Sequence, residues 1–204
     1  MSINLTLSSF QISNTRALHE DTDYVCVGMS VNKKVVAPLA KKVGNVNNGV
    51  HQVGLTFPLP NEYSATDQFV FSYLIINHGG GKTENVLTDC QNAVSLTSLM
   101  EYSTADAQVV SFQGRNLPQC FVNTERSEDT LNNWWNQIKA QFNHLSTDRC
   151  DGPVAIDRFS FLGSSMADVE LFMDVSTFSY QGIHSAVGCG SNSDYNVNWT
   201  IKVT

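Results

Sequence analysis

The chain has 204 residues, which fits one domain, and 42% of them are hydrophobic, which is enough to bury a core. Only 15% are charged, against about 25% in an average protein, and the net charge is −7. This acidic balance argues against nucleic acid as a partner, because phosphate binding needs a basic surface. No apolar run approaches the roughly 20 residues of a membrane helix, so no membrane span is predicted.

Strand-like patterns dominate the first part of the chain, and they cover residues 3–12, 23–31, 50–57 and 68–77. In the first of these, the apolar parity slips at Ser8-Ser9, which predicts a β-bulge. The near-continuous apolar run at 68–77 predicts a central strand covered on both faces.

Residues 32–48 are predicted to form a loop or a weak strand. Lysines flank the segment 35–40 within this stretch. This is typical of an edge strand that is protected against pairing with another sheet, and a basic contact patch is the alternative.

The hydrophobic period changes to a helical one in the middle of the chain. Thr83 is the expected N-cap of a helix over 84–101, and Ser127 is the expected cap of a second helix. The apolar residues of the second helix form one stripe at helical spacing: Leu131, Trp134, Trp135, Ile138, Phe142 and Leu145. Such a stripe indicates a buried face, although the paired tryptophans also suit a sugar-binding platform.

Strand patterns return after the helices at 153–162, 169–180 and 194–203, and shorter candidates lie at 108–113 and 119–122. In the last strand, apolar residues alternate with polar ones, so one face is expected against a core. The fold class is therefore mainly β with an α+β tendency. We expect a single domain over 1–204, an antiparallel β-sandwich with a helical insertion at about 83–146.

An acidic loop at residues 19–23 is the candidate metal site. It places Asp21 and Asp23 close together, and Asp194 in a later loop could join them. Carboxylate oxygens are the ligands that Ca²⁺ prefers, so these three residues are the predicted metal ligands and Ca²⁺ the predicted cofactor. A solvated acidic turn gives the same pattern.

A second candidate site lies in the loop between the last two strands. It offers Tyr180, His184 and Asn192, followed by Tyr195. These side-chain types hydrogen-bond sugar hydroxyls and stack on sugar faces, so the four are the predicted ligand-binding residues. Tyr195 also fits the apolar parity of its strand, which would place it in the core instead.

Two glycine-containing motifs suggest chemistry. His78 to Thr83 precedes a helix like a phosphate-binding loop, but the first glycine of that pattern is absent. Gly163 to Ala167 resembles a nucleophile elbow with Ser165 as the nucleophile, Asp174 and His184 as partners, and His78 to Gly81 as the oxyanion loop. Against this reading, the elbow ends in Ala, and few residues follow it.

The five cysteines are scattered and contain no CxxC pair, which argues against a cysteine-based zinc site. Cys26 and Cys90 are expected as core thiols, and Cys150 would pair with Cys189 if the chain is extracellular. No signal peptide is recognised, so the cytoplasm or leaderless secretion is favoured.

Three functions follow as hypotheses, and the balance leans away from an enzyme. The first is a lectin-like binding protein whose loops at one end of the sandwich hold a neutral polar ligand, above all a glycan, with the help of Ca²⁺. The second is a self-associating coat, toxin component or inclusion protein, in which the weakly charged, Asn-, Ser- and Thr-rich surface would pack between copies. The third is a small serine hydrolase that uses Ser165.

Overall fold

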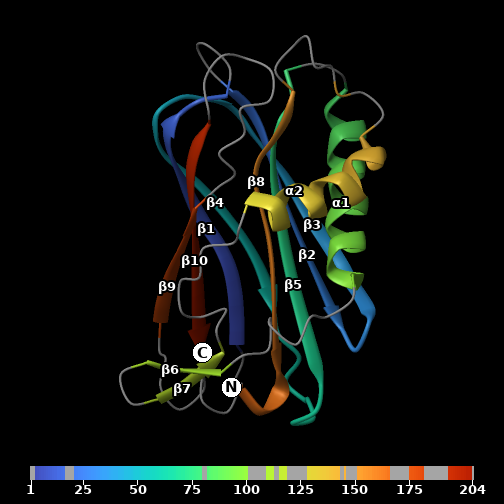
Figure 1. The fold of residues 1–204 in the computed structure, drawn as a ribbon, viewed down its shortest axis with the longest axis vertical. Coiled ribbons are helices and arrows are strands. Elements are labelled where there is room, and N and C mark those ends of the chain that lie inside the picture. The colour runs from blue at the N-terminus through green and yellow to red at the C-terminus, as the bar shows by residue number, and fades with distance from the viewer. Residues whose placement is uncertain are drawn as a thin grey trace.

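Two four-stranded antiparallel sheets pack face to face, and helices cover the outer side of one of them (Figure 1). The computed structural model describes residues 3–16, 21–79, 82–100, 109–112, 115–118, 128–142, 145, 151–165, 175–181 and 193–203. This architecture confirms the predicted mainly β sandwich with helices in the middle of the chain.

The first sheet has the order β4-β1-β10-β9, and the second has the order β3-β2-β5-β8. The strands of the first sheet are β4 (Gly49–Pro58), β1 (Ile3–Asn14), β10 (Asp194–Val203) and β9 (Val175–Gln181). Those of the second are β3 (Lys34–Val46), β2 (Asp21–Val31), β5 (Gln68–Asn77) and β8 (Gly152–Leu162). A separate hairpin joins β6 (Val109–Phe112) to β7 (Arg115–Pro118).

Several sequence predictions are confirmed by this topology. β1 changes register between Leu7 and Ser9, where the bulge was expected. β5 lies inside its sheet, and residues 69–77 are buried, as predicted for a strand covered on both faces. The predicted segments 119–122 and 169–174 lie outside the described residues.

Residues 34–46 form a full strand, so of the two alternatives expected for this stretch the structure has the strand, and its edge position is confirmed. β3 pairs only with β2 within its sheet and joins it through a two-residue turn. Asn32 and Lys33 in that turn have φ values of 49° and 62°, the left-handed conformation that tight hairpins require. Pairing with β2 overrides the weak local strand signal of this lysine-rich segment.

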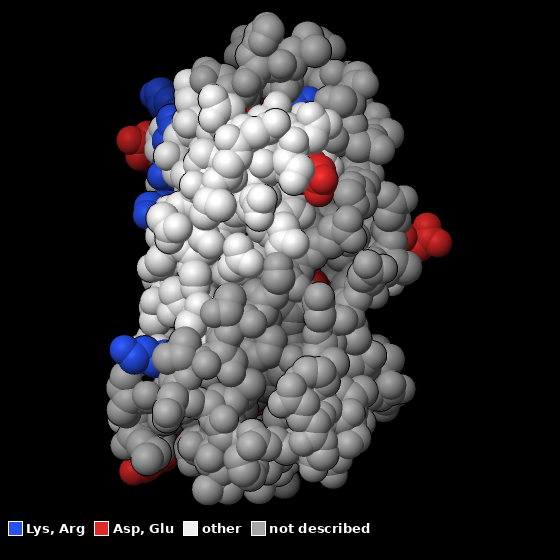
Figure 2. Space-filling model, turned by 90° about the vertical axis from the view of Figure 1, so that its left-hand side faces the viewer, with Lys and Arg blue, Asp and Glu red and all other residues white. Residues whose placement is uncertain are grey.

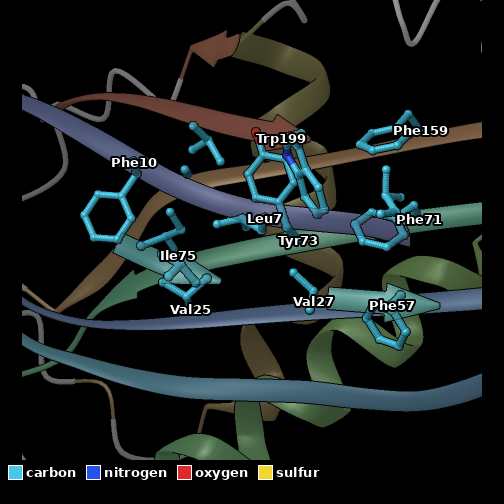
Figure 3. Close-up of a cluster of buried hydrophobic side chains, with 14 of the residues drawn as sticks. Leu7, Phe10, Val25, Val27, Phe57, Phe71, Tyr73, Ile75, Phe159 and Trp199 are labelled. Atoms are coloured by element: carbon cyan, nitrogen blue, oxygen red, sulfur yellow. The ribbon is translucent and has the colours of Figure 1, made fainter. Parts of the chain in front are cut away.

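The core between the sheets is built around Trp199 (Figure 3). Its ring centroid lies 4.4 Å from that of Phe71 in an edge-on contact, and 5.6 Å from that of Phe159. The alternate residues of β10 from Tyr195 to Ile201 are all buried, which confirms the predicted core-facing parity of this strand. Aromatic pairs of this kind add to the burial of apolar area.

A second core lies between the outer face of the second sheet and the helices α1 (Thr83–Leu99) and α2 (Glu128–Ile138), followed by the short helix η3 (Lys139–Gln141). The predicted stripe on α2 is buried here: Leu131, Trp134, Ile138 and Phe142. Trp135 and Leu145 are only partly buried. The buried stripe supports the packing interpretation over an exposed aromatic platform.

The predicted N-cap of α1 is one residue off. Lys82 is the capping residue, its backbone is extended, and no side chain caps the helix there. Thr83 is already the first helical residue, because the Lys82 carbonyl accepts the first helical N–H bonds, from Asn85 and Val86. Among the described residues, no helix is long and apolar enough to cross a membrane.

Candidate functional site

Asp21 and Asp23 lie on β2 and not in a loop, which corrects the sequence expectation. They continue the inward-facing parity of Val25 and Val27, so both side chains point between the sheets and are fully buried. Carboxylates are rarely found in a core unless hydrogen bonds satisfy them. The alternation of inward-facing residues along β2 was the sequence signal for this placement. The acidic character of the segment pointed instead to an exposed loop.

Tyr195 reaches this carboxyl pair from the opposite sheet. Its Oη lies 2.7 Å from Asp21 Oδ2 and 2.9 Å from Asp23 Oδ2, and its ring stacks on Phe10 with centroids 5.6 Å apart. The backbone N–H of Arg16 also donates to Asp21 Oδ2, at 2.7 Å. Burial and the two nearby carboxyls raise the pKa of Tyr195, so its hydroxyl keeps its proton.

Arg16 extends this polar cluster toward the end of β8. Its guanidinium donates to the carbonyl of Pro153 at 3.2 Å and to that of Asp151 at 3.5 Å. Burial lowers the pKa of Arg16, while the charges of Asp21 and Asp151 act in the opposite direction. A Cβ atom on Gly152 would lie 2.6 Å from Arg16 Nη2, so any larger residue there would displace the guanidinium from this position.

His78 and Asp151 form a buried pair at the same end of the sandwich. His78 Nδ1 lies 2.7 Å from Asp151 Oδ2, and the backbone N–H of Gly79 donates to Asp151 Oδ1 at 2.9 Å. Within the part of the chain that is described, no hydrogen bond engages His78 Nε2. A carboxylate that orients an imidazole in this way is a component of general-base sites, but a nucleophile beside it would be needed for such chemistry.

The three predicted calcium ligands do not converge. Asp194 is adjacent to Tyr195 in β10, so strand alternation directs it to the outer face of the first sheet, away from Asp21 and Asp23. No group of three His, Cys, Asp or Glu side chains suited to a metal occurs among the described residues. Calcium binding stays a prediction, and this geometry does not add to its support.

Of the predicted ligand contacts, Tyr195 is fully buried and its hydroxyl engages the two carboxyls. Tyr180 is placed in β9, opposite Val197 in register. His184 and Asn192 lie outside the described residues, so the predicted loop site stays a prediction.

Ser165 and His78 lie at opposite ends of the paired strands β5 and β8. Leu162, just before Ser165, pairs with Gln68, whereas His78 follows the other end of β5. About ten residues of strand separate the two positions, or roughly 30 Å. The proposed oxyanion loop at His78 therefore does not serve Ser165, and Asp174 and His184 lie outside the described residues.

The outer face of the first sheet carries a ladder of uncharged polar side chains, which we call the outer polar face: Thr6, Ser8, Gln11, Gln52, Thr56, Asn196, Asn198 and Thr200. Cross-strand bonds link its members, with Thr6 Oγ1 2.8 Å from Thr56 Oγ1 and Ser8 Oγ 2.6 Å from Thr200 Oγ1. Asn198 Nδ2 donates to Ser9 Oγ at 3.2 Å. These bonds orient the hydroxyl and amide groups that take part in them.

Charge is scarce on this face. The strands β1, β4 and β9 contain no Asp, Glu, Lys or Arg, and β10 has only Asp194 and Lys202, near its two ends. Figure 2 shows the side of the molecule on which these strands lie, and its described surface is broadly uncharged, with most of the Lys and Arg along one border. Sequence reasoning noted the low overall charge but could not assign it to one sheet.

Cys26 and Cys90 are free and fully buried, which confirms them as core thiols. They lie in the core where α1 packs on β2. Burial raises the pKa of Cys26, and the neighbouring Cys90 thiol is the second, smaller cause of the increase. Cys150 and Cys189 lie outside the described residues.

Comparison of the chain with protein-family models and with curated proteins finds no match.

Proposed function

We propose that this protein is a non-enzymatic binding protein whose ligand is neutral and polar, most simply a glycan, and that the outer polar face is its docking surface. The observation that carries the proposal is the ordered, uncharged row of hydroxyl and amide groups on β4, β1 and β10. Sugars present many hydroxyls and no charge, so they are matched by fixed donors and acceptors of this kind.

The accessibility of the amides supports this assignment. Gln11 and Gln52 are exposed on the face, and Asn196 is exposed beside Gln11 in register. An exposed amide offers two donors and one acceptor oxygen to a ligand, whereas the hydroxyls of Thr6 and Thr56 are already bonded to each other. The amides of Gln11 and Gln52 are therefore the expected direct contacts.

The test uses two matched double variants and a panel of neutral polysaccharides, measured by isothermal titration calorimetry. Gln11→Ala with Gln52→Ala removes two amides from the outer polar face. Asn85→Ala with Asn92→Ala removes two exposed amides from α1, on the opposite side of the sandwich. Losing two hydrogen bonds of about 0.5–1.5 kcal/mol each weakens binding by a factor between about 5 and about 150 in the first double variant and leaves binding by the second unchanged.

The proposal fails if no neutral polysaccharide binds, or if both double variants bind alike. The same surface would also suit packing between copies of this chain, which is the competing function. Sedimentation at several concentrations separates the two, because self-association predicts a mass that rises with concentration in the absence of ligand. Repeating the titration with EDTA tests the calcium prediction.

A further inference from the structure

Two free thiols of the second core belong to elements that pack against each other, Cys26 to β2 and Cys90 to α1. Both side chains are fully buried. The Cys90 side chain is hydrogen-bonded to that of Cys26, so the two sulfur atoms are neighbours. Neighbouring thiols on two different elements are the starting point for a disulfide that would join those elements.

Two contacts beside the cysteines define the alignment of α1 on β2. A Cβ atom on Gly28 would lie 3.0 Å from the Cβ atom of Val94. One step further along both elements, Ser30 Oγ donates to the Ser98 carbonyl at 2.7 Å. The helix therefore advances by four residues for every two residues of the strand.

The same alignment, extended by one step in the other direction, places Cys90 opposite Cys26. Alternate residues of a strand share a face, and residues four apart share a face of a helix. Two strand residues advance about 6.6 Å and four helical residues about 6.0 Å, so the elements stay in step over this short distance. The backbone arrangement thus brings the two cysteines face to face, in agreement with the contact between their side chains.

The separation of the two elements also suits a disulfide. Such a bond requires Cβ atoms about 3.5–4.5 Å apart. One step along, a Cβ atom on Gly28 would lie 3.0 Å from the Val94 Cβ, and Ser72 Oγ donates to the Val94 carbonyl at 2.8 Å. The helix therefore already approaches β2 as closely as a disulfide between them requires.

We propose that Cys26 and Cys90 form a disulfide under oxidising conditions, and that this crosslink fixes α1 to the second sheet. The thiolate of one cysteine attacks oxidised glutathione, which gives a mixed disulfide and releases one molecule of reduced glutathione. The other cysteine attacks the mixed disulfide, and the bond between the two cysteines forms as a second reduced glutathione leaves. The two thiols lose two electrons and two protons, and oxidised glutathione accepts them. This inference does not depend on the proposed ligand or on the outer polar face, which lies on the first sheet.

The reaction takes place during folding, or during transient openings that detach α1 from the sheet. Both thiols are fully buried in the folded protein, so glutathione does not reach them there. The disulfide, once formed, is shielded from reductants in the same way. The redox conditions under which the chain folds are therefore retained as the state of this pair.

The experiment refolds the wild type from urea in two buffers, one with oxidised and reduced glutathione and one with dithiothreitol. Remaining thiols are then alkylated in urea, and the protein is digested without reductant for peptide mapping by mass spectrometry. Cleavage after Lys and Arg leaves Cys26 and Cys90 on separate peptides, 17–33 and 83–115. These two peptides are expected to be linked after refolding in the glutathione buffer and separate after refolding in dithiothreitol. The proposal is overturned if both cysteines are alkylated after oxidative refolding, or if the bonds found join them to other cysteines.

Urea unfolding gives a second readout. A variant with Cys120→Ser, Cys150→Ser and Cys189→Ser keeps only the two core thiols, which excludes other pairings. A disulfide constrains the unfolded chain, so the unfolding equilibrium constant is expected to be lower by a factor of about 30 to about 1,000 in the oxidised form than in the reduced form.

Adding Cys26→Ala to this variant gives the control, whose stability is expected to be the same in both buffers. An oxidised form that is no more stable than the reduced form overturns the proposal, because the bond would then not fit the folded arrangement of α1 on β2. If the variant does not fold, the peptide mapping of the wild type decides the question.

Discussion

Gly28→Ala is expected to destabilise the fold, because β2 and α1 touch at this residue. A Cβ atom on Gly28 would lie 2.7 Å from the backbone oxygen of Val94 and 3.0 Å from its Cβ. The same oxygen accepts a hydrogen bond from Ser72 Oγ on β5 at 2.8 Å. This hydrogen bond holds α1 close to the sheet, and it would lengthen if α1 moved away from β2.

The size of the effect follows from these distances. Ordinary contact begins at 3.4 Å, so α1 must move away by about 0.7 Å, which takes the Ser72 bond out of its favourable range. Overpacking in a core costs about 1–3 kcal/mol, and a weakened hydrogen bond adds about 0.5–1.5 kcal/mol. Alanine also reduces the conformational freedom of the unfolded chain, which raises the unfolding free energy by about 0.4–1 kcal/mol. The net loss is about 2 kcal/mol of unfolding free energy.

Urea denaturation followed by far-UV circular dichroism measures this loss. Gly79→Ala is the matched control, because its new Cβ would have no neighbour closer than 4.0 Å among the described residues and its φ is not left-handed. The control is expected to change stability by less than about 1 kcal/mol. If Gly28→Ala is as stable as Gly79→Ala, the close packing of α1 on β2 is refuted.

Lys33 has a left-handed φ of 62°, so Lys33→Gly is expected to raise the unfolding free energy by about 1 kcal/mol. A lower unfolding free energy in urea denaturation would contradict the turn geometry. Trp134→Ala is expected to cost about 3–5 kcal/mol, and Trp135→Ala clearly less, because Trp134 is the buried member of the pair. Equal losses would contradict the packing of α2. Burial raises the pKa of Cys26, so an alkylating reagent at neutral pH is expected to modify Cys26 and Cys90 only after unfolding. Peptide mapping by mass spectrometry measures the labelling, and modification of either thiol in the folded protein would contradict its burial.

The elements that the sequence predicted well are those whose local pattern has one physical meaning. Strict alternation in β10 leaves one apolar face, and a sheet must bury that face. The stripe on α2 likewise has one buried side, which the structure places against the second sheet. In both cases the period of the apolar residues decides the element, without reference to distant parts of the chain.

Asp21 and Asp23 show where sequence reasoning was misled. Their charge suggested a solvent-exposed or metal-binding loop, although their spacing continued the inward parity of β2. Their burial depends on Tyr195, which lies 174 and 172 positions away from them in the sequence. No local pattern in the sequence indicates that a hydroxyl from the other sheet will contact both carboxyls.

The sequence by itself determined the mainly β class, the position of the helices within the chain, and the scarcity of charge. Each of these depends on residue type and short-range periodicity. The tertiary structure alone decided the strand order, the edge position of β3, the gathering of uncharged polar groups on one sheet, and the contact of Tyr195 with Asp21 and Asp23. These features arise from pairing between distant strands, and such pairing leaves no trace in the local sequence, because any two strands with matching faces satisfy the same pattern.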